Sequence, residues 1–145
     1  MNKIIICRGI PASGKSTWAK QWVLEDPEHR VRINRDDIHN MLGKYCAPSR
    51  ERLVSYINHT IIIKALISNY DIIIDNTNLN FNDILYLEEI LLIFNMKCTI
   101  EYKDFFDTPL SVCIERDKKR TNPIGEEIIK SFYNRYKDKY NLNGN

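Results

Sequence analysis

Eight consecutive residues near the N-terminus constrain this chain more than any other feature. Residues 9–16 read Gly-Ile-Pro-Ala-Ser-Gly-Lys-Ser and fit the pattern G-x-x-x-x-G-K-S/T. They follow the apolar run Lys3–Arg8 and precede a helical pattern over residues 16–25, so the pattern lies between a strand and a helix. Such a loop turns backbone N–H groups toward phosphate oxygens at the partly positive start of a helix. The sequence therefore predicts a phosphate-binding loop for a nucleoside triphosphate.

Short runs rich in Ile and Val predict buried strands. They cover Lys3–Arg8, 31–34, Asp71–Asp75 and 97–102, and each is nearly continuously apolar, as strands covered on both faces require. Helical patterns lie at residues 16–25, 49–68, 80–94, about 107–116 and about 125–140. This alternation predicts a three-layer α/β fold, with a parallel sheet of about four strands, helices on both faces and binding loops at the carboxyl ends of the strands.

Several details of the helices can be compared with a structure. One face of residues 49–68 carries Leu53, Ile57, Ile61 and Ala65, and one face of residues 80–94 carries Ile84, Leu87 and Leu91. Asp107-Thr108-Pro109 resembles a helix start. Trp18 and Trp22 are expected to pack in the core. The stripe of the last helix is expected to make core or subunit contacts rather than to stack on bases; its residues are Ile129, Phe132, Tyr133, Tyr136 and Tyr140. Residues 141–145 are expected to form a frayed tail.

Length and composition indicate one globular domain. The 145 residues are 43% hydrophobic, and the formal charge of +2 neither indicates nor excludes a nucleic-acid partner. The cysteines, namely Cys7, Cys46, Cys98 and Cys113, are widely spaced and are expected to be reduced core residues. Because no run approaches the roughly 20 apolar residues of a membrane span, we expect a cytoplasmic protein without membrane contact.

Polar residues after two of the apolar runs favour a kinase over other phosphate-loop proteins. Asp75 is followed by Asn76, whereas a hydrolysing ATPase usually places a water-orienting Glu there, and no guanine-reading Asn-Lys-x-Asp follows a later run. A kinase needs a carboxylate for the acceptor's proton and cations over the transferring phosphoryl group. Asp36 is the candidate carboxylate, and the adjacent Asp37 is expected to cap a helix. Residues 116–120 follow a helix and are expected to supply the cations as a short mobile lid.

Taken together, these motifs resemble the kinase domain of the phage-type polynucleotide 5′-kinase/3′-phosphatase, a P-loop kinase. The resemblance spans nearly the whole chain and rests on residues 9–18, 33–37, 75–80 and 106–109, and on Arg116 and Arg120. It implies an ATP- and Mg²⁺-dependent transfer of the γ-phosphate to 5′-hydroxyl ends of DNA or RNA, in nucleic acid repair.

The same resemblance assigns roles to individual residues. Asp36 would be the general base, with Lys15 and Arg120 as the other catalytic residues. The ATP-binding residues would be Gly9, Ala12, Ser13, Gly14, Lys15, Ser16, Thr17, Arg116 and Arg120. The acceptor would contact Arg35, His39, Thr77 and Asn78. Ser16 would ligate Mg²⁺, and Asp75 would act on the metal through a water.

Two positions depart from the family pattern. His39 stands where the family has an arginine that grips the acceptor's phosphate, and Asp75-Asn76 stands where phage-type enzymes have Ser-Asp. No Asp-x-Asp-x-Thr/Val nucleophile motif is present, so we expect a single kinase domain over residues 1–145 without a phosphatase domain. A separate phosphatase or ligase partner and a homo-oligomer are compatible with this interpretation.

Two other functions use the same parts. A small-molecule P-loop kinase would act on a hydroxyl of a nucleoside, sugar or other metabolite, with the same loop, base and lid. A non-enzymatic nucleotide-binding module would bind the triphosphate and transfer nothing.

Overall fold

The computed structural model describes residues 1–44 and 47–145. Within these ranges the strands are β1 (Lys3–Arg8), β2 (Arg30–Ile33), β3 (Asp71–Asp75) and β4 (Thr99–Asp104). The helices are α1 (Lys15–Leu24), α2 (Arg35–Met41), α3 (Pro48–Ile67), α4 (Phe81–Ile93), α5 (Leu110–Lys118) and α6 (Glu126–Tyr140). All strand pairs are parallel, and the sheet has the order β2-β3-β1-β4, which confirms the predicted fold class.

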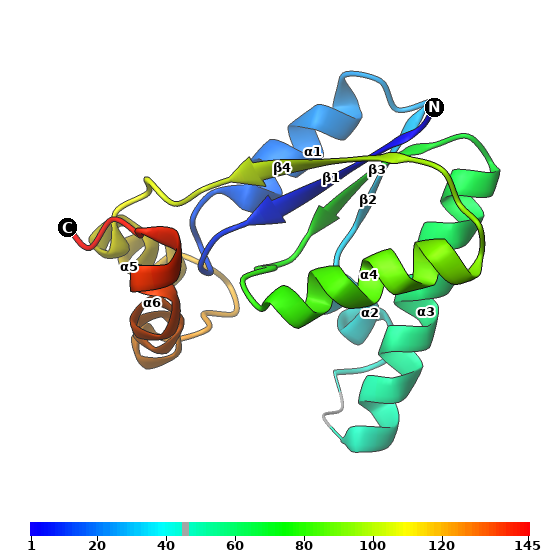
Figure 1. Cartoon of the computed structure of the whole chain (residues 1–145). Coiled ribbons are helices and arrows are strands. Elements are labelled where there is room, and N and C mark those ends of the chain that lie inside the picture. The colour runs from blue at the N-terminus through cyan, green and yellow to red at the C-terminus, as the bar shows by residue number, and fades with distance from the viewer. Residues whose placement is uncertain (45–46) are drawn as a thin grey trace.

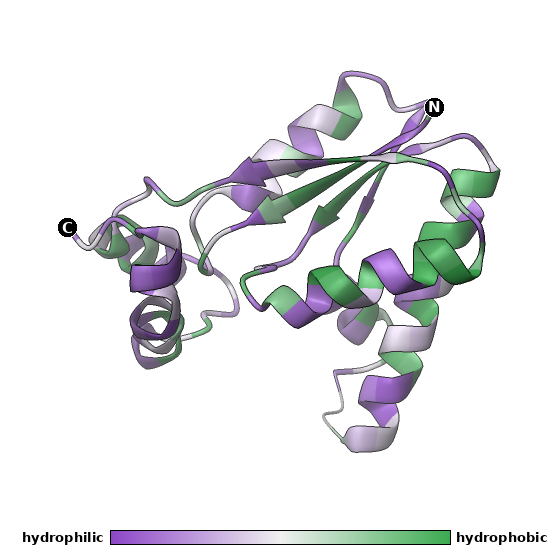
Figure 2. Ribbon diagram, viewed as in Figure 1, coloured by the Kyte–Doolittle hydropathy of each residue, from purple (hydrophilic) through white to green (hydrophobic). Residues whose placement is uncertain are grey.

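Helices cover both faces of the sheet (Figure 1). On one face, Ile5 and Cys7 of β1 pack with Trp22 of α1, as expected for that tryptophan. On the other face, Ile4 and Ile6 of the same strand join a larger cluster with α3 and α4. Because successive side chains of a strand point to opposite faces, one apolar run serves both layers. Figure 2 shows the resulting apolar centre at β1 and β3.

The C-terminal helices α5 and α6 lie beyond the carboxyl ends of the strands (Figure 1). The aromatic stripe of α6 contacts the protein interior, which confirms core packing for it: Ile129 is fully buried, and the four aromatic residues are partly buried around it. The same cluster contains Ile10 and Ala12, so α6 supports the predicted phosphate-binding loop. The Tyr140 hydroxyl also donates a hydrogen bond to the Leu79 carbonyl at 2.7 Å.

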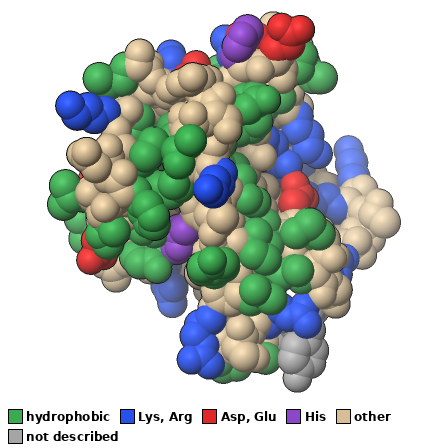
Figure 3. Space-filling view, turned by 90° about the vertical axis from the view of Figure 1, so that its right-hand side faces the viewer, with side chains coloured by type: hydrophobic (Ala, Val, Ile, Leu, Met, Phe, Trp, Pro, Cys, Tyr) green, Lys and Arg blue, Asp and Glu red, His purple; other side chains and the backbone are tan. Residues whose placement is uncertain are grey.

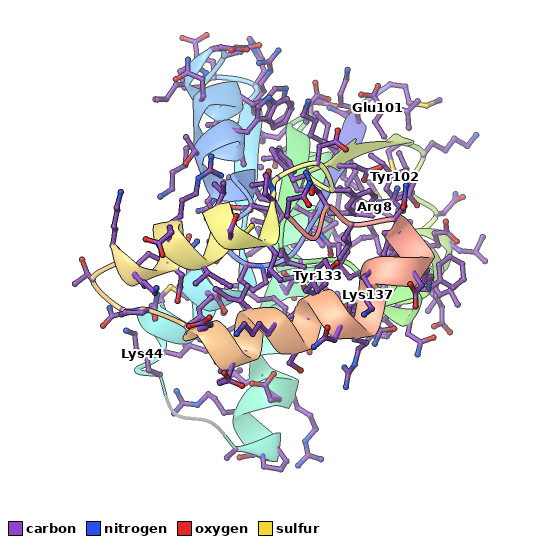
Figure 4. The ribbon with its side chains drawn as sticks, turned by 90° about the vertical axis from the view of Figure 1, so that its left-hand side faces the viewer. Arg8, Lys44, Glu101, Tyr102, Tyr133 and Lys137 are labelled. Atoms are coloured by element: carbon purple, nitrogen blue, oxygen red, sulfur yellow. The ribbon has the colours of Figure 1, made fainter. Side chains whose placement is uncertain are left out.

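Arg8 joins the end of β1 to β4 and α6. Its guanidinium donates hydrogen bonds to the two carboxylate oxygens of Asp104 at 2.7 and 2.9 Å. Its central carbon lies 4.2 Å from the centre of the Tyr102 ring and 5.4 Å from that of Tyr140. Figure 4 shows Arg8 and Tyr102 next to each other near the end of α6. Because a cation is attracted to the face of an aromatic ring, this cluster holds α6 against β4.

The buried face of α3 differs from the predicted one. Val54, Ile62 and Leu66 are buried, whereas Leu53 and Ile61 of the predicted stripe are 44% and 38% exposed. Both sets recur every four residues, and a shift of one residue rotates the helix face by about 100°. Contacts with β3 and α4 select the face, and these contacts are absent from the local pattern. On α4 the predicted residues Ile84, Leu87 and Leu91 are all buried.

The predicted strand β4 is present, but its bounds and its burial differ from prediction, and the prediction of a frayed tail is wrong. β4 begins at Thr99, and as an edge strand it leaves Glu101 and Tyr102 exposed rather than covered on both faces. The tail is ordered by backbone hydrogen bonds: the Leu110 N–H donates to the Asn143 carbonyl and the Asn143 N–H to the Phe106 carbonyl, both at 3.1 Å. These bonds pair the tail with the segment that precedes α5.

The start and the end of α5 also differ from prediction. The helix begins at Leu110, and the Thr108 hydroxyl donates a hydrogen bond to the Ser13 carbonyl at 2.9 Å rather than capping the helix. The helix continues to Lys118, so Arg116 lies in its last turn and not in a loop after it. The Arg116 guanidinium donates to the Ala12 carbonyl at 3.5 Å, so Arg116 and Thr108 tie α5 and the segment before it to the phosphate-binding loop.

The cysteines and the surface complete the description. Cys7 and Cys113 are buried free thiols, as expected, Cys98 is partly buried, and Cys46 lies outside the described residues. Burial raises the pKa of the Cys7 thiol to about 12. Within the described ranges no helix is long and apolar enough to cross a membrane. Figure 3 shows the end of the molecule opposite to α5 and α6, where exposed apolar side chains lie among polar ones.

We predict that Asp117 stabilises the junction between α5 and α6. Its carboxylate is buried and accepts hydrogen bonds from the Ile124 and Gly125 N–H groups, both at 2.9 Å, just before α6. Asp117→Ala should lower the free energy of unfolding by about 1–3 kcal/mol in urea titrations, because two N–H groups lose their acceptor. The exposed Asp138→Ala is the charge-matched control and should change it by less than about 0.5 kcal/mol. Equal stability of the two variants would contradict this role.

Candidate functional site

The two glycines of the phosphate-binding loop are needed for different reasons. Gly14 has a φ of 109°, a left-handed conformation that other residues rarely adopt. At Gly9 a Cβ atom would lie 2.6 Å from the Ser13 Oγ and 3.1 Å from the Phe105 Cβ, so a larger residue would displace one of these side chains. Gly14 is also the N-cap of α1 and offers no side-chain cap, so no side chain at that position competes with an anion at this helix start.

Lys15 lies folded against the loop. Its Nζ donates hydrogen bonds to the Gly9 and Ile10 carbonyls at 2.9 and 2.8 Å, and the side chain is buried. Burial lowers the pKa of Lys15 from 10.5 to about 8, against an opposing effect of the Asp75 carboxylate. A bound triphosphate would add negative charge beside this ammonium group and favour its charged form.

A cavity of about 720 Å³ opens over the loop. It is lined by eight of the nine predicted ATP-binding residues, namely Ala12, Ser13, Gly14, Lys15, Ser16, Thr17, Arg116 and Arg120. The ninth, Gly9, lies under the loop, where its carbonyl binds Lys15. Sequence reasoning missed Gln21, Phe105 and Thr108 in this wall, and it gave Trp18 a packing role only, although Trp18 both packs edge-on against Phe105 and lines the cavity.

A second cavity, of about 610 Å³, lies on the other side of the loop. Its lining includes Asp36 and all the residues predicted to bind the acceptor, namely Arg35, His39, Thr77 and Asn78. Pro11 lines this cavity and the adjacent Ala12 lines the first, so the loop separates the two. The sequence gave no signal for most of the far wall, which α3 and α4 supply.

Two asparagines fix Asp36 next to the loop. The Asn34 side chain caps α2 by accepting a hydrogen bond from the Asp37 N–H at 2.9 Å, and it donates to the Asp75 carbonyl at 2.5 Å. The Asn76 side chain accepts from the Arg35 N–H at 3.0 Å. The predicted capping role of Asp37 is therefore wrong, because α2 begins at Arg35, three residues earlier than a cap at Asp37 requires, and Asn34 occupies the cap.

Asp75 and Arg32 form a buried ion pair at the end of β3. The Arg32 Nε donates to Asp75 Oδ2 at 2.7 Å, and its Nη1 donates to Asp37 at 2.5 Å. The other oxygen, Asp75 Oδ1, is buried and accepts no hydrogen bond within the described residues. An unpartnered carboxylate oxygen suits a metal-bound water, so these residues fit Mg²⁺ held by Ser16 and Asp75. Arg32 was not identified from the sequence.

Other site residues are already engaged by protein groups. The Asn78 amide donates to the Cys7 carbonyl at 2.7 Å, so this residue supports the loop after β3 as well as lining the cavity. His39 Nε2 lies 3.0 Å from one carboxylate oxygen of Glu51, and the Arg35 guanidinium lies 3.1 Å from the other. A phosphate on the acceptor would meet these two side chains with Glu51 beside them.

Lys15 generates a prediction on proton uptake. In the free protein its pKa is about 8, and bound phosphates should raise it because they favour the charged form. ATP binding should therefore take up close to one proton at about pH 9 and almost none at pH 7, where Lys15 is already protonated. Calorimetry in buffers of different ionisation enthalpy measures this uptake, which should vanish in Lys15→Met and persist in the exposed control Lys20→Met. Equal uptake in both variants would contradict the assignment.

Comparisons with known proteins agree with a kinase fold. The chain is 26% identical over 136 residues to the L-seryl-tRNA(Sec) kinase of Methanococcus maripaludis, covering 92% of this chain and 52% of that protein. A chain in the structure of the Pnkp1/Rnl/Hen1 RNA repair complex superimposes with a TM-score of 0.78 at 25% identity, covering 95% of this chain and 45% of that one. The chain thus spans about half the length of these relatives.

A more distant structure and a family model place the chain more broadly. The APS kinase CysC of Mycobacterium tuberculosis shares the fold, with a TM-score of 0.51 at 11% identity, covering 71% of this chain and 76% of that one. A family model described as "AAA domain" matches residues 4–141. With the loop, the sheet order and these likenesses, the chain belongs to this AAA-domain family and has the fold of a P-loop kinase domain.

Proposed function

We propose that the protein is an ATP- and Mg²⁺-dependent kinase that transfers the γ-phosphate to the 5′-hydroxyl of a nucleic acid strand, as part of nucleic acid repair. The observation that carries this proposal is the pair of cavities on either side of the phosphate-binding loop. One contains the loop with Arg116 and Arg120, and the other contains Asp36. A γ-phosphate bound at the loop would therefore border a space in which an acceptor hydroxyl can face a carboxylate.

The residues have separate tasks in this reaction. Asp36 accepts the proton of the attacking hydroxyl and orients the oxygen, and it is exposed to the acceptor cavity. Lys15, Arg116 and Arg120 stabilise the charge that spreads over the transferring phosphoryl group. Ser16 and the free oxygen of Asp75 would hold the Mg²⁺, which neutralises charge on the β- and γ-phosphates when bound.

Relatives support an acceptor linked to RNA. One is named for a kinase of seryl-tRNA, and another forms part of an RNA repair complex. Arg35 and His39 at the cavity could contact an acceptor phosphate, which a polynucleotide carries and a free sugar lacks. In a repair setting, a separate phosphatase or ligase would act on the same ends.

A panel of acceptors tests the proposal. The protein is incubated with γ-labelled ATP, Mg²⁺ and 5′-hydroxyl DNA and RNA oligonucleotides, beside nucleosides, sugars and serine-charged tRNA. We expect label on the oligonucleotides, and none when the metal is chelated. Label confined to nucleosides and sugars would make the protein a small-molecule kinase, and label confined to charged tRNA would make it an aminoacyl-tRNA kinase. No label on any acceptor would favour a nucleotide-binding module.

The two adjacent carboxylates at the start of α2 should respond differently to substitution. Asp36→Asn keeps the shape and loses the basicity, so turnover on oligonucleotides should fall at least about 10²-fold with ATP affinity within a few-fold of the parent. Asp37→Asn weakens only an exposed contact with Arg32, so most activity should remain and stability should fall by less than about 1 kcal/mol. Steady-state kinetics and thermal melts on both variants decide, and the reverse pattern would assign the base to Asp37.

A further inference from the structure

Asn58 is a polar residue on the buried face of α3. It lies one turn from Val54 and one turn from Ile62, which are 0% and 1% exposed, and it is itself 8% exposed. Its Oδ1 is buried and accepts no hydrogen bond within residues 1–44 and 47–145. Leaving a buried acceptor without a donor destabilises a fold, so a residue of this kind needs an explanation.

The place of Asn58 indicates what could supply the missing donor. The residue lines the cavity that contains Asp36, and α4 contributes Asp83 and Tyr86 to the same wall. The rings of His59 and Tyr86 are edge to face, with centres 4.5 Å apart, and Ile62, Ile84 and Leu87 form the apolar part of the lining. This wall therefore combines apolar surface with a few polar groups, among them acceptor oxygens.

We infer that this wall is a subsite for the nucleobase of the acceptor's terminal nucleoside, with Asn58 Oδ1 accepting a hydrogen bond from an N–H group on the base edge. The inference rests on the proposed function. A nucleobase has apolar faces and N–H donors only at its edge, which matches such a wall. A phosphodiester has no donor to offer at neutral pH, and a sugar carries hydroxyls on every side, which apolar residues would leave without partners.

The subsite extends the role of the cavity from catalysis to selection. Asp36 is at one part of the lining and Asn58 at another, so the same nucleoside can present its hydroxyl to the first and its base to the second. A site with a buried acceptor disfavours ligands that lack the donor, because the acceptor then stays unpaired in the complex. Asn58 is thus a specificity-determining residue for the end of the strand.

A double-mutant cycle that removes the Asn58 side-chain oxygen, the terminal base or both tests the inference. Two 5′-hydroxyl oligonucleotides are compared, identical except that the terminal nucleotide of one is abasic. Asn58→Leu, which keeps a similar volume without an acceptor, should raise the KM for the normal oligonucleotide about tenfold, the factor for one hydrogen bond, with kcat changed less than about twofold. The KM for the abasic oligonucleotide should not change, because the partner is already absent.

Stability measurements and further variants separate this role from a structural one. Asn58→Leu should keep or raise the melting temperature of the free protein, since it removes an unpaired acceptor, whereas a side chain that supports the fold would lower it. Asn58→Ala removes the oxygen without adding bulk and should show the same dependence on the base. The exposed Asn134→Leu is the matched control and should change neither KM nor melting temperature.

Each other outcome decides a different point. Suppose that Asn58→Leu and Asn58→Ala each phosphorylate both oligonucleotides and change the KM for the abasic oligonucleotide as much as the KM for the normal one. This result overturns the base subsite and leaves the proposed function standing. A lower melting temperature with an unchanged KM also overturns it, because Asn58 would then be structural. If the parent protein phosphorylates neither oligonucleotide, the proposed function fails, and the base subsite fails with it.

Discussion

The arrangement of the site depends on the buried carboxylate at the end of β3. Asp75 is 1% exposed, and Arg32 from the neighbouring strand donates to it at 2.7 Å. Asn34 donates to the carbonyl of the same residue, and so the last residue of β3 holds the start of α2. A buried charge is tolerated only when it is paired and hydrogen-bonded, so removing any one of these partners should lower the stability of the fold. They keep Asp36 at the edge of the sheet where the phosphate-binding loop lies.

The same region concentrates positive charge from three side chains. Lys15 is buried with a lowered pKa, and Arg116 and Arg120 line the cavity in front of it. The Arg116 guanidinium donates to the Ala12 carbonyl at 3.5 Å, and the Arg120 guanidinium is 3.9 Å from the Asp117 carboxylate. These like charges repel one another, and a bound triphosphate would offset that repulsion while the fold holds the cations in place. On the acceptor side, by contrast, Glu51 already pairs with Arg35 and His39.

Much of the candidate site could be predicted because its signals are local or lie in short motifs. Gly14 supplies the left-handed backbone of the loop, and the strand before the loop and the helix after it are readable within a few residues. The ordered motifs around Asp36 and Thr77 bring the acceptor residues to one cavity, because parallel strands end at the same edge of the sheet. Arg32 was missed because its partner lies 43 residues away in the sequence.

Sequence alone determined the class of fold, the phosphate-binding loop and the set of motifs at the strand ends, since each depends on neighbours along the chain. Only the tertiary structure decided which face of α3 is buried, and with it that Asn58 lies in the wall of the acceptor cavity. It also decided that Asn34 rather than Asp37 caps α2, and that the tail is ordered against the segment before α5. The physical reason is that several adjacent faces of a helix can carry apolar residues at a spacing of four. Packing against distant strands and helices then selects which face is buried.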